Sequence, residues 1–92
     1  MPKIYHSKRF EKSFKKLLKS GNFDDSKLDK VLLELEEGNK LEIKYKDHQL
    51  TGNMQSFREC HIENDLLLIY EVSKSENRIK MIDIGSHSDL FE

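Results

Sequence analysis

Residues 57–72 read FRECHIENDLLLIYEV and carry the strongest β-strand signal of the chain. Phe57 to Ile62 favours one strand, and Leu66 to Val72, which holds the most apolar run of the sequence, favours a second. Glu63-Asn64-Asp65 between them supplies turn residues. Because side chains alternate between the two faces of a strand, one face of the second strand is predicted to carry Leu66, Leu68, Tyr70 and Val72.

A third strand is predicted from Arg78 to Ile84, after a turn at Lys74 to Asn77. The connections between the three strands are short, and short connections predict an antiparallel meander. The hydrophobic pattern of the third strand changes phase between Met81 and Ile82. This change indicates either a β-bulge or weak patterning.

The N-terminal part is predicted to contain a strand and two amphipathic helices. Lys3 to His6 favours a short strand, and Ser7 is a suitable N-cap for a helix that Gly21 ends. The second helix is predicted to start at Asp24 or Asp25 and to stop at Gly38. The apolar residues recur at helical spacing in both segments, namely at Phe10, Phe14, Leu17, Leu18, Leu28, Val31, Leu32 and Leu35.

Residues 39–56 show no clean period and are interpreted as an ordered loop with apolar anchors at Leu41, Ile43, Tyr45 and Leu50. The order β-α-α-β-β-β predicts an α+β fold. Two N-terminal helices are expected to pack on one face of a small antiparallel sheet, and the other face is left free for function. We expect residues 1–92 to form a single domain.

Composition and charge limit the classes of protein to which this chain can belong. The single cysteine, Cys60, rules out an internal disulfide and fits a reducing, cytoplasmic setting. No apolar run approaches the roughly 20 residues that a membrane span needs, and no secretion signal is seen. The net charge is −1, yet residues 1–20 hold seven bases and one acid. Charge alone leaves two interpretations open, a phosphate-facing surface and, slightly favoured, a solvated helix face.

Five polar residues in the second half are candidates for moving protons at a phosphodiester: His48, Arg58, His61, Asp65 and His87. Histidine serves as acid or base because its free pKa, about 6.5, lies near the working pH. A zinc site made by the three histidines and the aspartate is an alternative, but the spacings are loose. Each residue also has an ordinary structural explanation as a surface, turn or capping group.

The motifs YKDHQLTG (45–52), FRECHIENDLLLIYEV and IGSHSDLF (84–91), in this order, resemble the YafQ branch of the RelE/ParE toxin superfamily. These are bacterial toxins of type II toxin–antitoxin systems. The resemblance implies a ribosome-dependent mRNA endoribonuclease that works by metal-independent acid–base attack of the 2′-hydroxyl on the scissile phosphate, without a cofactor. Because the superfamily's ParE branch contains gyrase inhibitors, a toxin that acts by binding, on DNA gyrase or as an antitoxin-docked co-repressor, is the alternative.

The resemblance also implies roles for individual residues. The catalytic positions of the family fall on His48, His61, Asp65 and His87, and the substrate-binding positions fall on Arg58 and Phe91. Two positions depart from the pattern of some relatives, with Leu66 in place of a tryptophan and Asp83 in place of a basic residue. Cys60 is expected to face the core without a chemical role.

Partners follow from the same resemblance. A cognate antitoxin of the DinJ or RelB type, the ribosome and mRNA are expected, while operator DNA is expected to bind only through the toxin–antitoxin complex. No membrane is involved in this scheme. The first helix supplies the expected contacts to ribosomal RNA, through Lys8, Arg9, Lys12, Lys15, Lys16 and Lys19.

Overall fold

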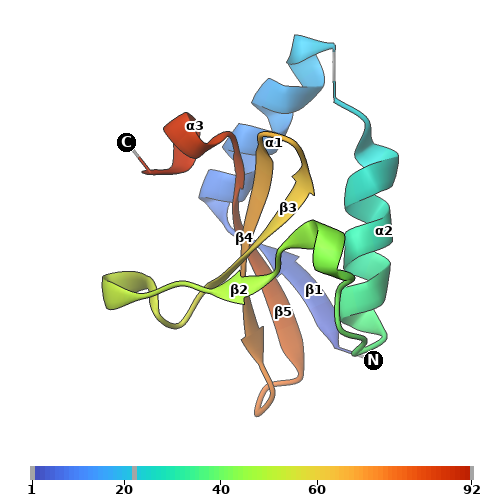
Figure 1. Cartoon of the computed structure of the whole chain (residues 1–92), viewed down its shortest axis with the longest axis vertical. Coiled ribbons are helices and arrows are strands. Elements are labelled where there is room, and N and C mark those ends of the chain that lie inside the picture. The colour runs from blue at the N-terminus through green and yellow to red at the C-terminus, as the bar shows by residue number, and fades with distance from the viewer. Residues whose placement is uncertain (1, 22, 92) are drawn as a thin grey trace.

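A mixed sheet forms the centre of the fold (Figure 1). The computed structural model describes residues 2–21 and 23–91, and within them five strands pair in the order β1-β5-β4-β3-β2. The strands are β1 (Lys3–His6), β2 (His48–Gln49), β3 (Arg58–Glu63), β4 (Leu66–Ser73) and β5 (Arg78–Gly85).

The expected antiparallel arrangement holds for β2 to β5, whereas β1 departs from it. β1 runs parallel to β5, with Ile4 opposite Ile79. Two helices separate β1 from the rest of the sheet along the chain, and a connection of that length allows a strand to return in the parallel direction. The sheet is therefore mixed, with its parallel pair at one edge.

Both N-terminal helices form where the sequence places them. α1 (Lys8–Ser20) begins after Ser7, whose hydroxyl accepts a hydrogen bond from the backbone N–H of Phe10. The same hydroxyl donates to the carbonyl of Ile82 at 2.6 Å, which attaches the start of the helix to β5. α1 ends at Gly21 in the left-handed conformation, and α2 (Asp25–Glu36) begins after Asp24. A third helix, α3 (His87–Phe91), follows β5.

The core lies between the two long helices and one face of the sheet. Cys60 is fully buried there, and burial raises the pKa of its thiol to about 12. The opposite face, expected to be free for function, buries Leu67 and Ile69 at its centre, with 0% and 2% exposed, and carries Glu59 and His61 directly opposite them on β3. The helix-side core consists of Phe10, Leu28, Val31, Cys60, Ile62, Leu66, Leu68, Tyr70, Ile79, Met81 and Ile84.

The segment between α2 and β3 is more structured than expected. It holds two 3-10 turns, η1 (Ile43–Tyr45) and η2 (Gly52–Met54), and the short edge strand β2. Tyr45 packs against the core as expected, whereas Ile43 is 94% exposed and anchors nothing within the chain. β2 escaped detection because two residues cannot show an alternating pattern.

Ile82 forms a bulge in β5, which confirms one of the two interpretations of the phase change. Ile69 pairs with Asp83 and Tyr70 pairs with Met81, so Ile82 has no partner in β4. None of the helices in the described ranges is long and apolar enough to cross a membrane.

Candidate active site

β3 and its neighbour β2 place two histidines around one buried carboxylate. Glu59 and His61 lie on the same face of β3 because they are two residues apart, and His48 of β2 pairs directly opposite Glu59. The Glu59 oxygen Oε1 lies 3.6 Å from Nε2 of His48 and 3.8 Å from Nε2 of His61. The Glu59 side chain is only 5% exposed.

The GSH motif brings the third histidine to this carboxylate by turning the chain after β5. A Cβ on Gly85 would lie 3.0 Å from the Cβ of Asp89, a tight contact that glycine avoids where α3 folds back. The Ser86 hydroxyl accepts from the Asp89 N–H, and the Asp89 carboxylate accepts from the Ser86 N–H, both at 3.2 Å. This reciprocal cap fixes the first turn of α3 and hence the position of His87.

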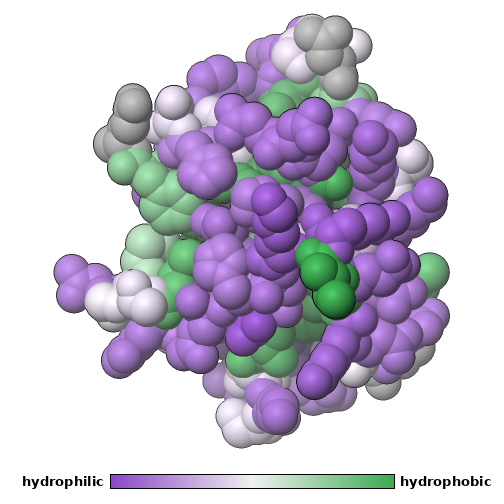
Figure 2. Space-filling model, viewed as in Figure 1, coloured by the Kyte–Doolittle hydropathy of each residue, from purple (hydrophilic) through white to green (hydrophobic). Residues whose placement is uncertain are grey.

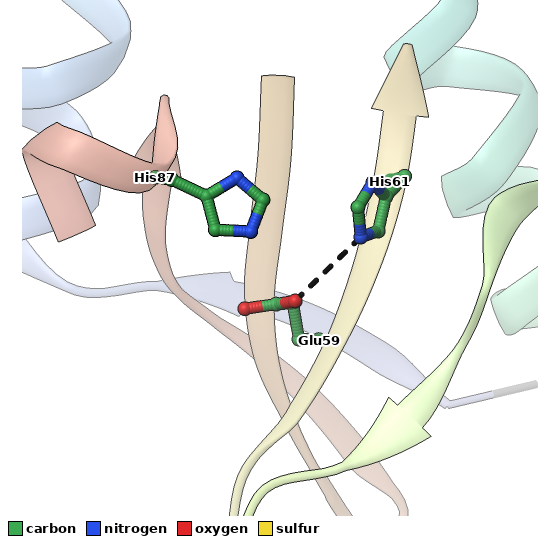
Figure 3. Close-up of side chains that lie close together, drawn as sticks. All are labelled: Glu59, His61 and His87. Atoms are coloured by element: carbon green, nitrogen blue, oxygen red, sulfur yellow. Dashed lines mark ion pairs between the residues drawn. The ribbon is translucent and has the colours of Figure 1, made fainter. Parts of the chain in front are cut away.

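Asp65, in the β3–β4 turn, holds His87 in place. Its Oδ1 lies 3.2 Å from both the backbone nitrogen and the ring Nδ1 of His87. These hydrogen bonds, the backbone one first, lower the pKa of the Asp65 carboxyl. The His87 ring centre is 5.8 Å from that of His61, and Figure 3 shows both rings converging on Glu59.

The environment of His61 favours its neutral form. Burial lowers the pKa of this histidine, and the charges of Lys46, His87 and His48 act in the same direction, while Glu59 opposes them. A neutral imidazole near pH 7 can accept a proton, which is what a general base must do.

His48 is held in one orientation by its own loop. Its Nδ1 lies 2.7 Å from the Lys46 carbonyl, so this nitrogen donates its proton there. Nε2 is then the nitrogen that faces Glu59. About half of the His48 side chain is exposed, so solvent and a ligand can reach the ring.

Arg58 does not join the histidines. It precedes Glu59 on β3 and therefore points to the opposite face, where its guanidinium contacts the Asp47 carboxylate at 2.9 Å. Tyr70 donates a short hydrogen bond to the same carboxylate. Asp47 raises the pKa of Arg58, and burial followed by Asp47 raises that of Tyr70. This arrangement anchors the residue just before His48 rather than presenting Arg58 to the cluster.

The remaining predicted residues lie near the surface. Phe91 is 45% exposed and its ring centre lies 6.2 Å from that of His87, so it borders the cluster. The basic residues of α1 are all exposed, but the Arg9 guanidinium is bound to the buried Asp83 at 2.9 Å. Ser13 also donates to Asp83, at 2.6 Å. Asp83 therefore joins α1 to β5 and is no part of the cluster.

No site role was predicted from the sequence for Glu59, Asp47 or Tyr70. Glu59 could have been found from the alternation of β3, which places it on the face of His61. That signal becomes convincing only once β2 is known to lie alongside, because His48 then faces the same carboxylate. Asp47 and Tyr70 are 23 positions apart, and nothing local indicates their contact.

Part of the cluster can hold a metal ion. Glu59, His61 and His87 offer ligand atoms that lie within 4.8 Å of one another. Two imidazole nitrogens and a carboxylate oxygen suit zinc, copper or nickel. This set differs from the metal site weighed from sequence, because it includes Glu59 but lacks His48, and Asp65 is engaged with Nδ1 of His87.

The mixed sheet with its two N-terminal helices matches solved YafQ structures, which have the RelE-like fold. The family model for the bacterial toxin of type II toxin–antitoxin systems, YafQ, matches residues 2–92. The mRNA interferase toxin YafQ of Escherichia coli (strain K12) is 33% identical over 90 residues, which cover 96% of this chain and 94% of that protein. The chain therefore belongs to the YafQ family of toxins.

Solved structures agree with this assignment. A metal-bound toxin from Helicobacter pylori superposes with a TM-score of 0.91 at 46% identity and covers 99% of this chain and 100% of that one. YafQ in the DinJ–YafQ complex of E. coli superposes with a TM-score of 0.86 at 29% identity over 100% of both chains.

Proposed function

We propose that this protein is a ribosome-dependent mRNA endoribonuclease of a type II toxin–antitoxin system. Membership of the YafQ family and the name of the E. coli relative, an mRNA interferase toxin, support the activity. The observation that carries it to this chain is the gathering of His48, His61 and His87 around the buried carboxylate of Glu59. Three imidazole side chains, the type of group best suited to acid–base catalysis, then meet at a surface that RNA can reach.

For RNA cleavage at such a cluster, the protein itself needs only to transfer protons. The 2′-oxygen attacks the adjacent phosphorus as a base removes its proton, and the bond from phosphorus to the 5′-oxygen breaks as an acid protonates that oxygen. The products are a 2′,3′-cyclic phosphate and a free 5′-hydroxyl. Positioned proton transfer contributes typically about 10²–10⁴-fold to such a rate.

Two of the histidines differ in ways that suit these two roles. The lowered pKa of His61 makes it our candidate for the base that takes the 2′ proton. His87 is our candidate for the acid, because the Asp65 carboxylate lies 3.2 Å from its Nδ1 and can pair with the protonated ring. His48 and Glu59 then provide a polar environment for the phosphate and keep the His61 ring in place.

Expression of wild type and His87→Ala in bacteria, with growth and mRNA 5′ ends followed together, tests this function. The wild type should arrest growth and generate new 5′ ends at defined codon positions, and His87→Ala should do neither. His6→Ala is a matched control, since His6 lies at the end of β1, pairs with Glu11 and is outside the cluster. Growth arrest without new ends would contradict the nuclease and point to a toxin that acts by binding.

The proposed activity implies its partners and its compartment. An antitoxin of the DinJ type should cover the toxin, since the E. coli relative YafQ forms a complex with DinJ. The ribosome presents the mRNA, so we place the protein in the cytoplasm. The pair should reach operator DNA through the antitoxin.

A further inference from the structure

A basic cleft opens beside His61 and has no role in the chemistry described above. It has a volume of about 370 Å³ and lies between α2, η1 and the end of β3. Figure 2 shows that the face carrying β2 and α2 is largely hydrophilic. Four lysines line this lysine cleft together with His61: Lys27, Lys30, Lys44 and Lys46.

The positive charge of the lysine cleft is only partly balanced. Lys27 pairs with Glu63 at 3.2 Å, and Lys44 lies 4.0 Å from Glu42 at the limit of an ion pair. Within residues 2–21 and 23–91, Lys30 and Lys46 have no carboxylate oxygen within 4.0 Å. The fold thus brings like charges together from α2 and from η1 with its C-cap residue, in a chain whose net charge is −1. Such an arrangement attracts anions.

We propose that the lysine cleft binds the sugar–phosphate backbone of single-stranded mRNA next to the scissile phosphate. The inference rests on the proposed nuclease activity and extends it. His61 belongs both to the cluster and to the wall of the cleft, so a strand cut at His61 continues directly into the cleft. Lysine ammonium groups bind phosphates as point charges and read no base edges, so the cleft positions RNA without selecting its sequence.

Binding in the cleft also affects the cluster. The charge of Lys46 is one of the causes that lower the pKa of His61, after burial. A phosphate placed beside Lys46 offsets that charge and makes His61 a stronger base once substrate is bound. Substrate binding and proton abstraction are therefore coupled through one lysine.

Fluorescence anisotropy with a labelled single-stranded oligoribonucleotide, made uncleavable by a 2′-deoxy group at the cut position, tests the cleft without ribosomes. The double variant Lys30→Gln/Lys46→Gln should bind about tenfold more weakly at low salt. Its plot of log K against log salt should lose about 1.4 in slope, because each phosphate contact contributes about 0.7 for single strands. Lys3→Gln/Lys40→Gln makes the same charge change outside the cleft and should bind like wild type.

A second measurement separates this inference from the proposed function. In a ribosome-dependent cleavage assay the lysine double variant should show a raised KM with kcat changed far less. If wild type cleaves mRNA and the variant keeps its RNA affinity and its KM, the proposed role of the lysine cleft is wrong. The nuclease function would still stand. If the variant loses affinity for the oligoribonucleotide but wild type cleaves no mRNA, the lysine cleft still binds RNA. The proposed nuclease activity alone would then be wrong.

The competing occupant of a basic cleft is an acidic segment of the antitoxin. The same double variant, titrated with purified antitoxin, should keep its affinity for that protein. Weakened antitoxin binding with unchanged oligoribonucleotide binding would assign the lysine cleft to the antitoxin and overturn the proposal.

Discussion

At the scale of single residues, Glu59 is the group around which the histidines of the candidate active site gather. Its carboxylate is nearly inaccessible to water, yet two imidazoles approach one of its oxygens, and a ring nitrogen of His87 lies within 4.8 Å of the carboxylate. A buried carboxylate needs compensating partners, because desolvation of a charge is costly. The histidines supply these partners, so the groups proposed for catalysis also stabilise the carboxylate between them.

The lowered pKa of His61 gives a pH prediction. If neutral His61 is the base, kcat/KM should rise with pH through a pKa below the ordinary value of about 6.5 for histidine. Lys46→Gln removes one of the charges that lower this pKa, so its acid limb should move to higher pH. The pH–rate profiles of the two proteins, measured with saturating ribosomes, check both points.

Lys3→Gln is the control for this profile, because Lys3 is exposed on β1 and carries the same charge. If the acid limb of the Lys46→Gln profile lies at the same pH as that of wild type, His61 is not the general base. Glu59 would then be the next candidate for that role.

At the scale of elements, β2 owes its position to contacts on the far side of β3. Asp47, the residue before β2, is bound by both Arg58 and Tyr70. His48 follows immediately and is thereby held opposite Glu59. We infer that the three-residue network of Asp47, Arg58 and Tyr70 supports His48 and that Arg58 is a positioning residue.

A double-mutant cycle tests this support. Tyr70→Phe should lower the free energy of unfolding by about 0.5–1.5 kcal/mol, as expected for the loss of one hydrogen bond. Asp47→Asn should also be destabilising, and the two changes together should cost less than their sum, with a coupling of about 0.5–3 kcal/mol. Urea unfolding of the four proteins measures these quantities.

Arg58→Gln distinguishes the two roles considered for this residue. A positioning role predicts that its loss of nuclease activity largely disappears when Asp47 is already changed to Asn. An Arg58→Gln variant with wild-type stability and a large additional loss of activity in the Asp47→Asn background would instead assign Arg58 to phosphate binding.

The elements also show what the sequence can reveal about the fold. α1 and α2 were predictable because apolar spacing and caps such as Ser7, Gly21 and Asp24 are local signals. The meander was predictable because its turns are short, and even the bulge at Ile82 left a trace in the pattern. The parallel pairing of β1 with β5 was not predictable, because a strand's partner across a long connection leaves no local signal.

The lack of local sequence signals for long-range contacts also limited what could be predicted about the candidate active site. The gathering of three histidines was expected from a resemblance, while the environment of each was not. Glu59 lies between charged and apolar residues on a strand, and only the placement of β2 reveals that its carboxylate is enclosed. The resemblance places Arg58 beside the histidines, whereas the alternation of β3 directs it to the other face.

At the scale of the whole molecule, positive charge occurs on two separate surfaces. One is the exposed side of α1, and the other is the lysine cleft beside His61. The first was expected to contact ribosomal RNA, and Arg9 is least suited to that role because it already pairs with Asp83. We propose that these two surfaces have separate roles, in which α1 contacts the ribosome and the lysine cleft binds the mRNA.

Charge reversal on α1 tests this division. Lys12→Glu/Lys19→Glu should weaken ribosome binding steeply, and wild-type binding should fall with salt, because contacts to the RNA backbone release counterions. The affinity for a short oligoribonucleotide should change far less than in the lysine-cleft variant. Sedimentation with ribosomes at several salt concentrations provides the measurement, and unchanged ribosome binding at low salt would contradict a role for α1.

The parallel pair at the edge of the sheet has a consequence for the synthesis of the toxin. β1 is made first, yet among the described residues its only strand partner is β5, which begins at residue 78. His87 follows β5 by two positions. A growing chain therefore cannot complete either its sheet or its histidine cluster until residues 78–87 have been translated.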